Sequence, residues 1–113
     1  MQIVELRQGD VDVVAPTGRI DTTTVAALDA RLTPLLAGAK PRLVVDFSGV
    51  EYISSAGLRV LLVAARRVQV SGGRLALCGM GGPVSQVFQL AGFLPLFTIC
   101  DTRDAAVARI AAP

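Results

Sequence analysis

The alternation of apolar and polar residues at the start of the chain predicts an antiparallel hairpin. Residues 2–7 alternate as one strand does, and residues 11–14 form a second short strand. Between them, Gln8-Gly9-Asp10 is a turn signal, and Pro16-Thr17-Gly18 loosens the end of the second strand. We therefore expect the chain to open with two paired strands.

Between residues 25 and 36 the apolar spacing changes to that of a helix with one buried stripe. The side chains of this stripe are Val25, Leu28, Leu32, Leu35 and Leu36. Residues 21–24 supply candidates for the N-cap, and Pro34 is expected to kink the helix or mark its frayed last turn.

A near-continuous apolar run over residues 43–47 predicts a central strand that is covered on both faces. Ser48-Gly49 breaks this strand, and a leucine-rich helix follows from about residue 55 to residue 70. The side chains expected to face inward are Leu58, Leu61, Leu62, Ala65 and Val68, and those expected to face solvent are Arg59, Arg66 and Arg67.

The last third of the chain alternates strand and helix again. Residues 74–78 form a strand, and a glycine-rich loop then leads to Pro83, which suits the first turn of a helix. Residues 94–100 contain a final edge strand, and Asp101 is expected to cap a short helix over residues 105–111.

This order of elements predicts an α/β fold with a mixed, mostly parallel sheet of about five strands and four helices. The connections from residue 14 to 43 and from 47 to 74 each contain a helix, so each can join parallel strands by a right-handed crossover. With 113 residues, the chain has room for one domain, which we take as residues 1–113.

The composition is that of a folded domain with no sign of a nucleic-acid or membrane partner. Apolar residues make up 52% of the chain and charged residues 18%, which suffices for a real core. The net charge is +2, and the densest basic pair is Arg66-Arg67, so no basic stripe is available for nucleic acid. The N-terminus does not resemble a signal peptide and no apolar run is long enough to span a bilayer, so we expect a cytoplasmic protein.

The sequence offers few parts for a metal site, a cofactor site or an enzyme. There is no His, and Cys78 and Cys100 lie in or beside apolar runs, so buried free thiols are expected. The serines lack a nearby base, and residues 79–82 lack the Lys-Ser/Thr of a phosphate-binding loop. We expect no enzyme activity, no metal and no cofactor; a small-ligand role of the glycine loop and a Mg²⁺ role of Asp21 and Asp46 are the alternatives.

Two adjacent serines, Ser54 and Ser55, stand at the N-terminus of the leucine-rich helix. Unpaired backbone N–H groups and the positive end of the helix dipole favour a phosphate there. A hydroxyl at this place is either a plain N-cap or a phosphorylation switch, and the residues alone favour the cap. Because sites in α/β sheets gather at the carboxyl ends of strands, the loop at residues 18–21 and the segment 46–57 are expected to converge.

Residues 44–58 closely resemble the signature of STAS domains, and more closely that of the stand-alone bacterial anti-anti-sigma factors, or anti-sigma factor antagonists. The family pattern is an apolar strand, Asp-x-Ser, a short spacer, Ile-Asp/Ser-Ser-Ser/Ala-Gly-Leu and a Leu-rich helix. Residues 18–21, Gly-Arg-Ile-Asp, resemble its Gly-x-Leu/Ile-Asp segment. The resemblance covers essentially the whole chain and implies a single STAS-like domain.

In such proteins the serine two residues before the Gly-Leu pair accepts a phosphate, and that position is Ser55 here. The resemblance implies a cognate anti-sigma factor that is also a serine kinase. The unphosphorylated antagonist binds it and frees a sigma factor, phosphorylation ends binding, and a serine phosphatase restores it. Since the ATP sits in the partner, no cofactor is needed. Ser54 replaces a frequent Asp, which makes it a rival acceptor, and Ala56 replaces a frequent Ser.

The partner-binding residues expected from this resemblance are Asp21, Asp46, Ser48, Ser54, Ala56, Gly57 and Arg59. For Asp46 and Ser48 a role in a strand-end turn is an equal alternative, and Gly57 either admits a partner backbone or packs closely within its own domain. We expect a monomer or weak dimer. The alternative function is a constitutive structural STAS subunit of a larger complex, stressosome-like or lipid-transport-like, in which Ser55 is not phosphorylated.

Overall fold

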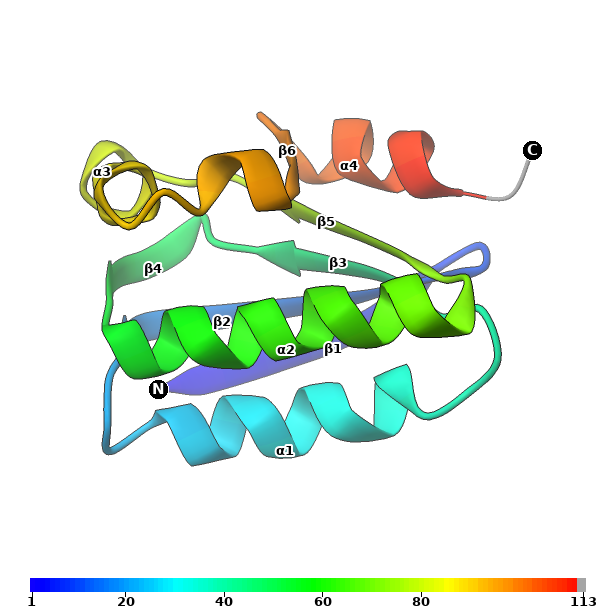
Figure 1. Cartoon of the computed structure of the whole chain (residues 1–113), viewed down its shortest axis with the longest axis horizontal. Coiled ribbons are helices and arrows are strands. Elements are labelled where there is room, and N and C mark those ends of the chain that lie inside the picture. The colour runs from blue at the N-terminus through cyan, green and yellow to red at the C-terminus, as the bar shows by residue number, and fades with distance from the viewer. Residues whose placement is uncertain (112–113) are drawn as a thin grey trace.

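The opening hairpin is present, but its second strand runs past the predicted end. In the computed structural model, which describes residues 1–111, β1 (Gln2–Gln8) pairs antiparallel with β2 (Val11–Ile20). The other elements, drawn in Figure 1, are α1 (Val25–Leu36), β3 (Arg42–Asp46), β4 (Gly49–Ile53), α2 (Ser55–Ser71), β5 (Arg74–Cys78), α3 (Gly82–Leu90), the 3₁₀ helix η1 (Leu94–Leu96), β6 (Thr98–Cys100) and α4 (Arg103–Ile110). The described residues thus form the four predicted α-helices, and six strands rather than about five.

The sheet is mixed and mostly parallel, as predicted. Its strands lie in the order β1-β2-β3-β5-β6, and β4 pairs with β2. Only the β1–β2 pair is antiparallel among the strand pairs of residues 1–111, and β6 occupies the expected edge. The crossover from β2 to β3 contains α1, and the connection from β4 to β5 contains α2. The predicted crossovers are therefore confirmed.

β2 changes its parallel neighbour part-way along its length. Residues 12–14 are in register with β3, whereas residues 17–20 are in register with β4. Pro16 lies between these two segments, so its missing backbone N–H removes no rung from either parallel ladder. Pro16-Thr17-Gly18 therefore marks a change of neighbouring strand. The prediction that this segment loosens the end of the strand is wrong, because β2 continues to Ile20.

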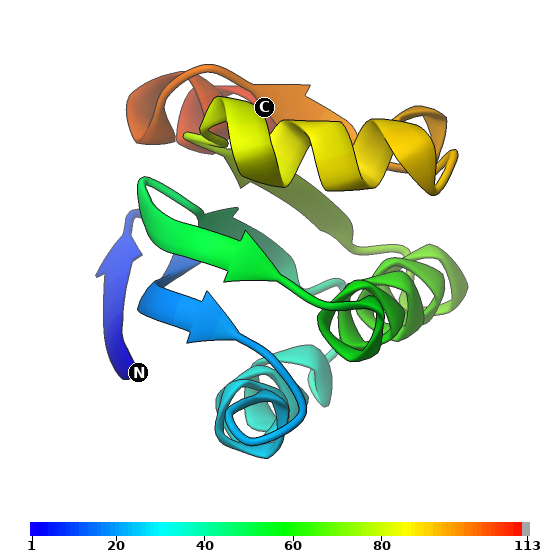
Figure 2. The ribbon, with the colours of Figure 1, turned by 90° about the vertical axis from the view of Figure 1, so that its left-hand side faces the viewer.

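Both faces of the sheet are covered, which explains why its central strands are apolar throughout. Helices α1 and α2 pack on one face of the sheet (Figure 2), and α3 packs against β4. Leu28, Leu61 and Phe88 of these three helices are buried in one cluster. The opposite face is covered by α4, whose buried residues are Ala106 and Ile110. Because three helices contribute to this one cluster, it forms the larger part of the core.

One predicted helix cap is corrected by the structure, and the other is confirmed in its position. Thr102 rather than Asp101 caps α4, because its hydroxyl accepts the backbone N–H of Ala105 at 3.1 Å. At α1, Thr24 occupies the N-cap position, but its side chain forms no capping bond to the helix. Pro34 lies within the last turn of α1, as one of its two predicted roles required, and the helix continues past it to Leu36.

The two cysteines differ in accessibility. Cys78 on β5 is fully buried, whereas Cys100 on β6 is half-buried, and both are free thiols. They lie opposite each other in the β5–β6 register and contribute to the cluster under α4. The expectation of buried free thiols is confirmed for Cys78 and holds only in part for Cys100.

Candidate functional site

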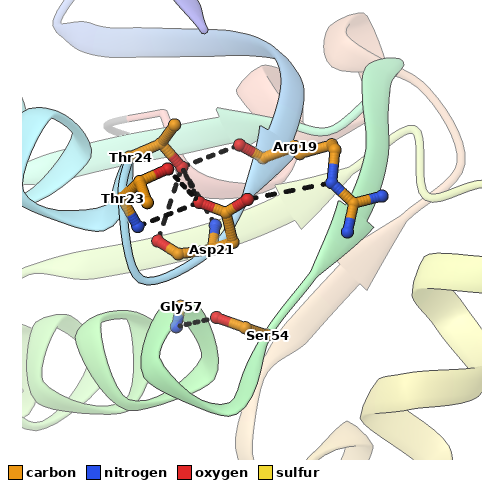
Figure 3. Close-up of polar contacts among 6 residues, drawn as sticks. All are labelled: Arg19, Asp21, Thr23, Thr24, Ser54 and Gly57. Atoms are coloured by element: carbon orange, nitrogen blue, oxygen red, sulfur yellow. Dashed lines mark hydrogen bonds and ion pairs between the residues drawn. The ribbon is translucent and has the colours of Figure 1, made fainter.

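The first turn of α2 separates the roles of the two adjacent serines. Ser54 has extended backbone angles, and its Oγ accepts the backbone N–H of Gly57 at 3.3 Å (Figure 3). Ser54 is therefore the N-cap of the helix. Ser55 is the first helical residue and is exposed, and its hydroxyl forms no hydrogen bond within residues 1–111. The idea that Ser55 serves as the cap is wrong, because its neighbour already fills that place.

Gly57 is required by close packing within the domain. The residue is buried in the first turn of α2. A Cβ built on it would lie 2.7 Å from Cγ2 of Ile20 and 2.8 Å from Cγ1 of Ile53. Of the two roles open for Gly57, these distances favour close approach of α2 to the ends of β2 and β4.

The loop after β2 is held by a network around Asp21. Its Oδ1 accepts the backbone N–H of Thr23 at 3.0 Å and the Thr23 hydroxyl at 2.7 Å. The Thr24 hydroxyl lies 3.3 Å from the same oxygen and donates to the carbonyl of Arg19 at 2.7 Å (Figure 3). The hydrogen bonds from Thr23, with its hydroxyl first, lower the pKa of Asp21, so this carboxylate is charged at neutral pH.

The Asp21 loop and the start of α2 lie side by side, as the sequence predicts. The backbone N–H of Ser54 donates to the carbonyl of Ile20 at 2.8 Å, which ties the end of β4 to the end of β2. Arg19 lies over the ring of Tyr52, with its Cζ 4.3 Å from the ring centroid, and its Nε is 3.7 Å from Oδ2 of Asp21. We call the area formed by the exposed residues Arg19, Tyr52, Ser55 and Arg59 and by half-buried Asp21 the α2 entry surface.

Arg59 and Ala56 complete the first two turns of α2. Arg59 is exposed and follows Ser55 by four residues, so the two side chains share one face of the helix. No salt bridge of Arg59 is found within residues 1–111, and the first turn of α2 contains no acidic residue. Ala56 is half-buried and adds no polar group.

Asp46 and Ser48 lie elsewhere than the sequence suggests. The five residues of β4 stand between Ser48 and Ser54, a separation of about 20 Å at the rise of a strand. Asp46 is only 5% exposed, and its Oδ1 accepts the backbone N–H of Ser48 at 2.9 Å and also the Ser48 hydroxyl. Its Oδ2 accepts Nε of Arg103 from α4 at 2.9 Å. These contacts favour the strand-end turn, the second of the two roles open for these residues.

The Asp46 carboxylate is ionised although it is buried. Burial by itself would raise its pKa, but the hydrogen bonds from Ser48 and the guanidinium of Arg103 outweigh burial and lower the pKa overall. Gly79 packs against this corner with φ of 70°, and a Cβ there would come within 2.7 Å of Oδ1 of Asp46. The corner is therefore built for one fixed arrangement of the loops after β3 and β5.

Sequence reasoning missed Arg103, Arg19 and Tyr52. Arg103 meets Asp46 across 57 positions of sequence, so no local spacing could reveal the pair.

The described part of the chain contains neither a cluster of acidic or thiol side chains that could hold a metal ion nor a helix suited in length and apolarity to cross a membrane. Asp21 and Asp46 form no joint site, since each is engaged by different residues.

Comparison with known proteins decides the family. The family model described as STAS domain matches residues 3–106, which is most of the chain. The chain belongs to the STAS domain family. The Ser54–Ser55 turn, the Asp21 loop and the Asp46 corner described above all lie within the matched residues.

Similar proteins carry one recurring name. BtrV of Bordetella bronchiseptica, named as an anti-sigma factor antagonist, is 36% identical over 91 residues, which are 80% of this chain and 78% of BtrV. A crystal structure of an anti-sigma factor antagonist from Mycobacterium paratuberculosis is 26% identical, with a TM-score of 0.89 over 98% of this STAS domain and 94% of that chain. SpoIIAA of Bacillus in its phosphorylated form is 19% identical and shares the fold, with a TM-score of 0.73 over 96% of this chain and 99% of that one.

Proposed function

We propose that this STAS domain is an anti-sigma factor antagonist whose binding to a cognate anti-sigma factor is switched off by phosphorylation of Ser55. The anti-sigma factor is itself the serine kinase and holds the ATP, so the antagonist needs no cofactor. Binding releases a sigma factor, and a serine phosphatase resets the antagonist. The observation that carries the proposal is the exposed Ser55 hydroxyl, free of hydrogen bonds within residues 1–111 and next to a cap that Ser54 already provides.

Ser55 is a better phosphate acceptor than Ser54 for a structural reason. A kinase needs the hydroxyl free and accessible, and Ser55 meets both conditions. Ser54 is half-buried, and its hydroxyl oxygen already accepts the backbone N–H of Gly57. The rival acceptor is thus the less accessible of the two hydroxyls.

The α2 entry surface can accept the negative charge of a phosphate without unfolding. A phosphate adds about −1.5 to −2 charges at neutral pH. The helix dipole favours such a charge at the N-terminus by about 0.3–1 kcal/mol. Arg59, one turn along the same face, supplies a guanidinium that is not engaged in a salt bridge within residues 1–111. The phosphorylated fold of SpoIIAA agrees with this tolerance.

Binding of a partner to this surface would be far more sensitive to the phosphate than the fold is. Burying a phosphate against a second protein costs several kcal/mol unless the partner supplies matching cations. A loss of about 4 kcal/mol already weakens binding about a thousandfold. The same modification therefore leaves the antagonist folded and removes its partner.

The α2 entry surface also provides contacts for recognition. Arg19, Tyr52 and Arg59 belong to the residue types that contribute most at interfaces, and Asp21 adds a charged group in a fixed position. Asp46 and Gly57, in contrast, are buried and serve the domain itself. We therefore place the partner on the exposed residues at the start of α2 and on the Asp21 loop.

The test is intact-mass spectrometry of the protein incubated with ATP and each candidate anti-sigma kinase from its own genome, followed by mapping of the modified residue. The expected result is one phosphate on Ser55 and loss of the complex in a pull-down or calorimetric titration. Ser54→Ala is the matched control, since it leaves the acceptor and removes only the neighbouring hydroxyl. It should still take up one phosphate, whereas Ser55→Ala should take up none.

Other outcomes separate the competing functions. Stable binding without transfer would keep the antagonist and remove the switch. Phosphate on Ser54 would move the switch by one residue. Neither binding nor transfer with any candidate would favour the constitutive structural subunit, for which Ser55→Asp should also leave assembly unchanged.

A further inference from the structure

A pocket lies at the opposite end of the molecule from Ser55. It has a volume of about 370 Å³ and is lined by residues from the C-terminal part of α2, the start of β5, the η1–β6 segment and the last turn of α4. Figure 1 shows where these elements lie. The apolar residues that line it are Ala65, Val68, Leu75, Leu96, Phe97 and Ile110. The polar ones are Gln69, Arg74, Thr98 and Arg109. This volume falls at the lower end of the range of about 300–1,000 Å³ that small-molecule sites occupy.

The walls of this pocket are held by backbone and side-chain bonds. At the end of α2, the N–H of Gly73 donates to the carbonyl of Val68 at 2.7 Å, which closes the helix end. The N–H of Arg74 then donates to the carbonyl of Pro41 at 2.7 Å. On the α4 side, Arg42 donates to the carbonyl of Ile110 at 2.7 Å. The pocket is therefore present before any ligand binds, which lowers the cost of binding.

The charge of the lining has one sign. Arg74 and Arg109 stand on different walls, and neither forms a salt bridge within residues 1–111. Among the residues described by the structure, no acidic one lines the pocket. A lining that combines two arginines with six apolar side chains matches a ligand with an anionic head and a compact apolar body.

We propose that this pocket, the α2–α4 pocket, binds a small amphipathic anion: a carboxylate or phosphate on a short apolar chain. The head group lies between Arg74 and Arg109, and the chain lies against Leu75 and Phe97. Ser55 and Gln69 are fourteen positions apart on α2, which is about 21 Å along the axis of a helix. The inference is thus independent of the proposed switch and stands if Ser55 is never phosphorylated.

The test is a titration of the ¹⁵N-labelled protein, residues 1–113, with octanoate and, separately, with octyl phosphate, followed by NMR chemical shifts. These two probes share the chain and differ in the head group, so they also show which anion is preferred. Octanamide, which has the same chain and no charge, and inorganic phosphate, which has no chain, are the two reference ligands. The expected result is saturable shifts at the lining residues with at least one octyl anion, and clearly weaker binding of both references.

Variants on the exposed arginines locate the head group. Arg74→Gln and Arg109→Gln should each raise the Kd about two- to fivefold, the range that one exposed charge pair provides. Arg67→Gln is the matched control, since this exposed arginine lies on α2 outside the pocket and should leave the Kd unchanged.

Three results would overturn the proposal. The first is no saturable shift with either octyl anion at millimolar concentration. The second is octanamide or inorganic phosphate binding as tightly as the octyl anions. The third is an Arg67→Gln effect equal to that of the pocket variants. The comparison among ligands uses the wild-type protein, so it decides the matter even if an arginine variant folds poorly.

Discussion

The Oγ of Ser54 accepts the backbone N–H of Gly57 at 3.3 Å, and this one bond divides two adjacent serines into a structural and an available hydroxyl. Without it, either residue would satisfy the pattern of a serine before a helix. With it, the stability of α2 depends on Ser54, and chemistry at Ser55 is free of that constraint.

Stability should therefore separate the two serines. Ser54→Ala is expected to lower the free energy of unfolding by about 1 kcal/mol, since an N-cap is lost. Ser55→Ala should change it by less than about 0.5 kcal/mol, as is usual for exposed positions. Urea denaturation of both variants under identical conditions checks this. Equal losses would mean that the capping bond is not held in solution.

Gly57→Ala should destabilise the domain although alanine favours helices. The gain in helix propensity is about 1 kcal/mol. The new methyl group meets Ile20 and Ile53 at under 3 Å, and such overpacking costs about 1–3 kcal/mol. A net loss of stability is therefore expected. Gly38→Ala, in the loop after α1, is the matched control, because the new Cβ would have no atom within 4 Å. It should be neutral or slightly stabilising.

Ser55→Asp should keep the fold and lose the partner. A carboxylate in the first turn of α2 interacts favourably with the helix dipole by about 0.3–1 kcal/mol, so the melting temperature should stay the same or rise slightly. Binding to the cognate anti-sigma factor should fall below detection in calorimetry. Ser55→Asn has similar size without charge and should retain binding. If both variants lose binding, shape rather than charge governs the contact.

The Asp46–Arg103 pair predicts how stability depends on acid. Because the pKa of Asp46 is lowered in the folded protein, its charged form contributes stability at neutral pH. This contribution begins to fall as the pH approaches the ordinary value of 3.8 and is lost as the pH drops through the lower folded value. Unfolding measured between pH 6 and pH 2.5 should show a smaller loss for Asp46→Asn than for the wild type. Asp21, whose pKa is also lowered, adds to the loss in both proteins.

The two thiols should differ strongly in reactivity. Burial and, after it, the nearby Asp46 carboxylate raise the pKa of Cys78 to about 12, so almost no thiolate is present at pH 8. Cys100 is half-buried and reachable from solvent. Alkylation with iodoacetamide, followed by peptide mass spectrometry, should therefore modify Cys100 well before Cys78. Comparable rates would show that β6 opens readily.

The sequence predicted most of the fold, and the strand it missed has a specific cause. In β4 the buried residues are Val50 and Ile53, three positions apart, so the strand lacks the alternation by which strands are recognised. The spacing arises from a bulge: Gly18 pairs with Val50 and Arg19 with Tyr52, which leaves Glu51 as an extra residue. A search for apolar residues at every second position does not find a strand whose alternation is interrupted by a bulge.

The sequence predicted only part of the candidate site, because the rest depends on backbone angles and on contacts between residues far apart in sequence. The meeting of the Asp21 loop with the start of α2 followed from strand order, because parallel strands end at one edge of a sheet. Which serine caps the helix depends on backbone angles at Ser54, which the pattern Ser-Ser leaves undecided. The burial of Asp46 depends on Arg103, and a contact that distant in sequence needs the folded chain.

The position of α4 has a consequence for how the protein is made. One face of the sheet has all of its covering helices before residue 91, but the face under α4 has to wait for residues 103–110. Until they emerge from the ribosome, Val13, Val44 and Ala76 form an apolar surface open to water. This face of the sheet is therefore covered only after residues 103–110 have been synthesised, and a chain interrupted before Arg103 would expose an apolar face to chaperones and proteases.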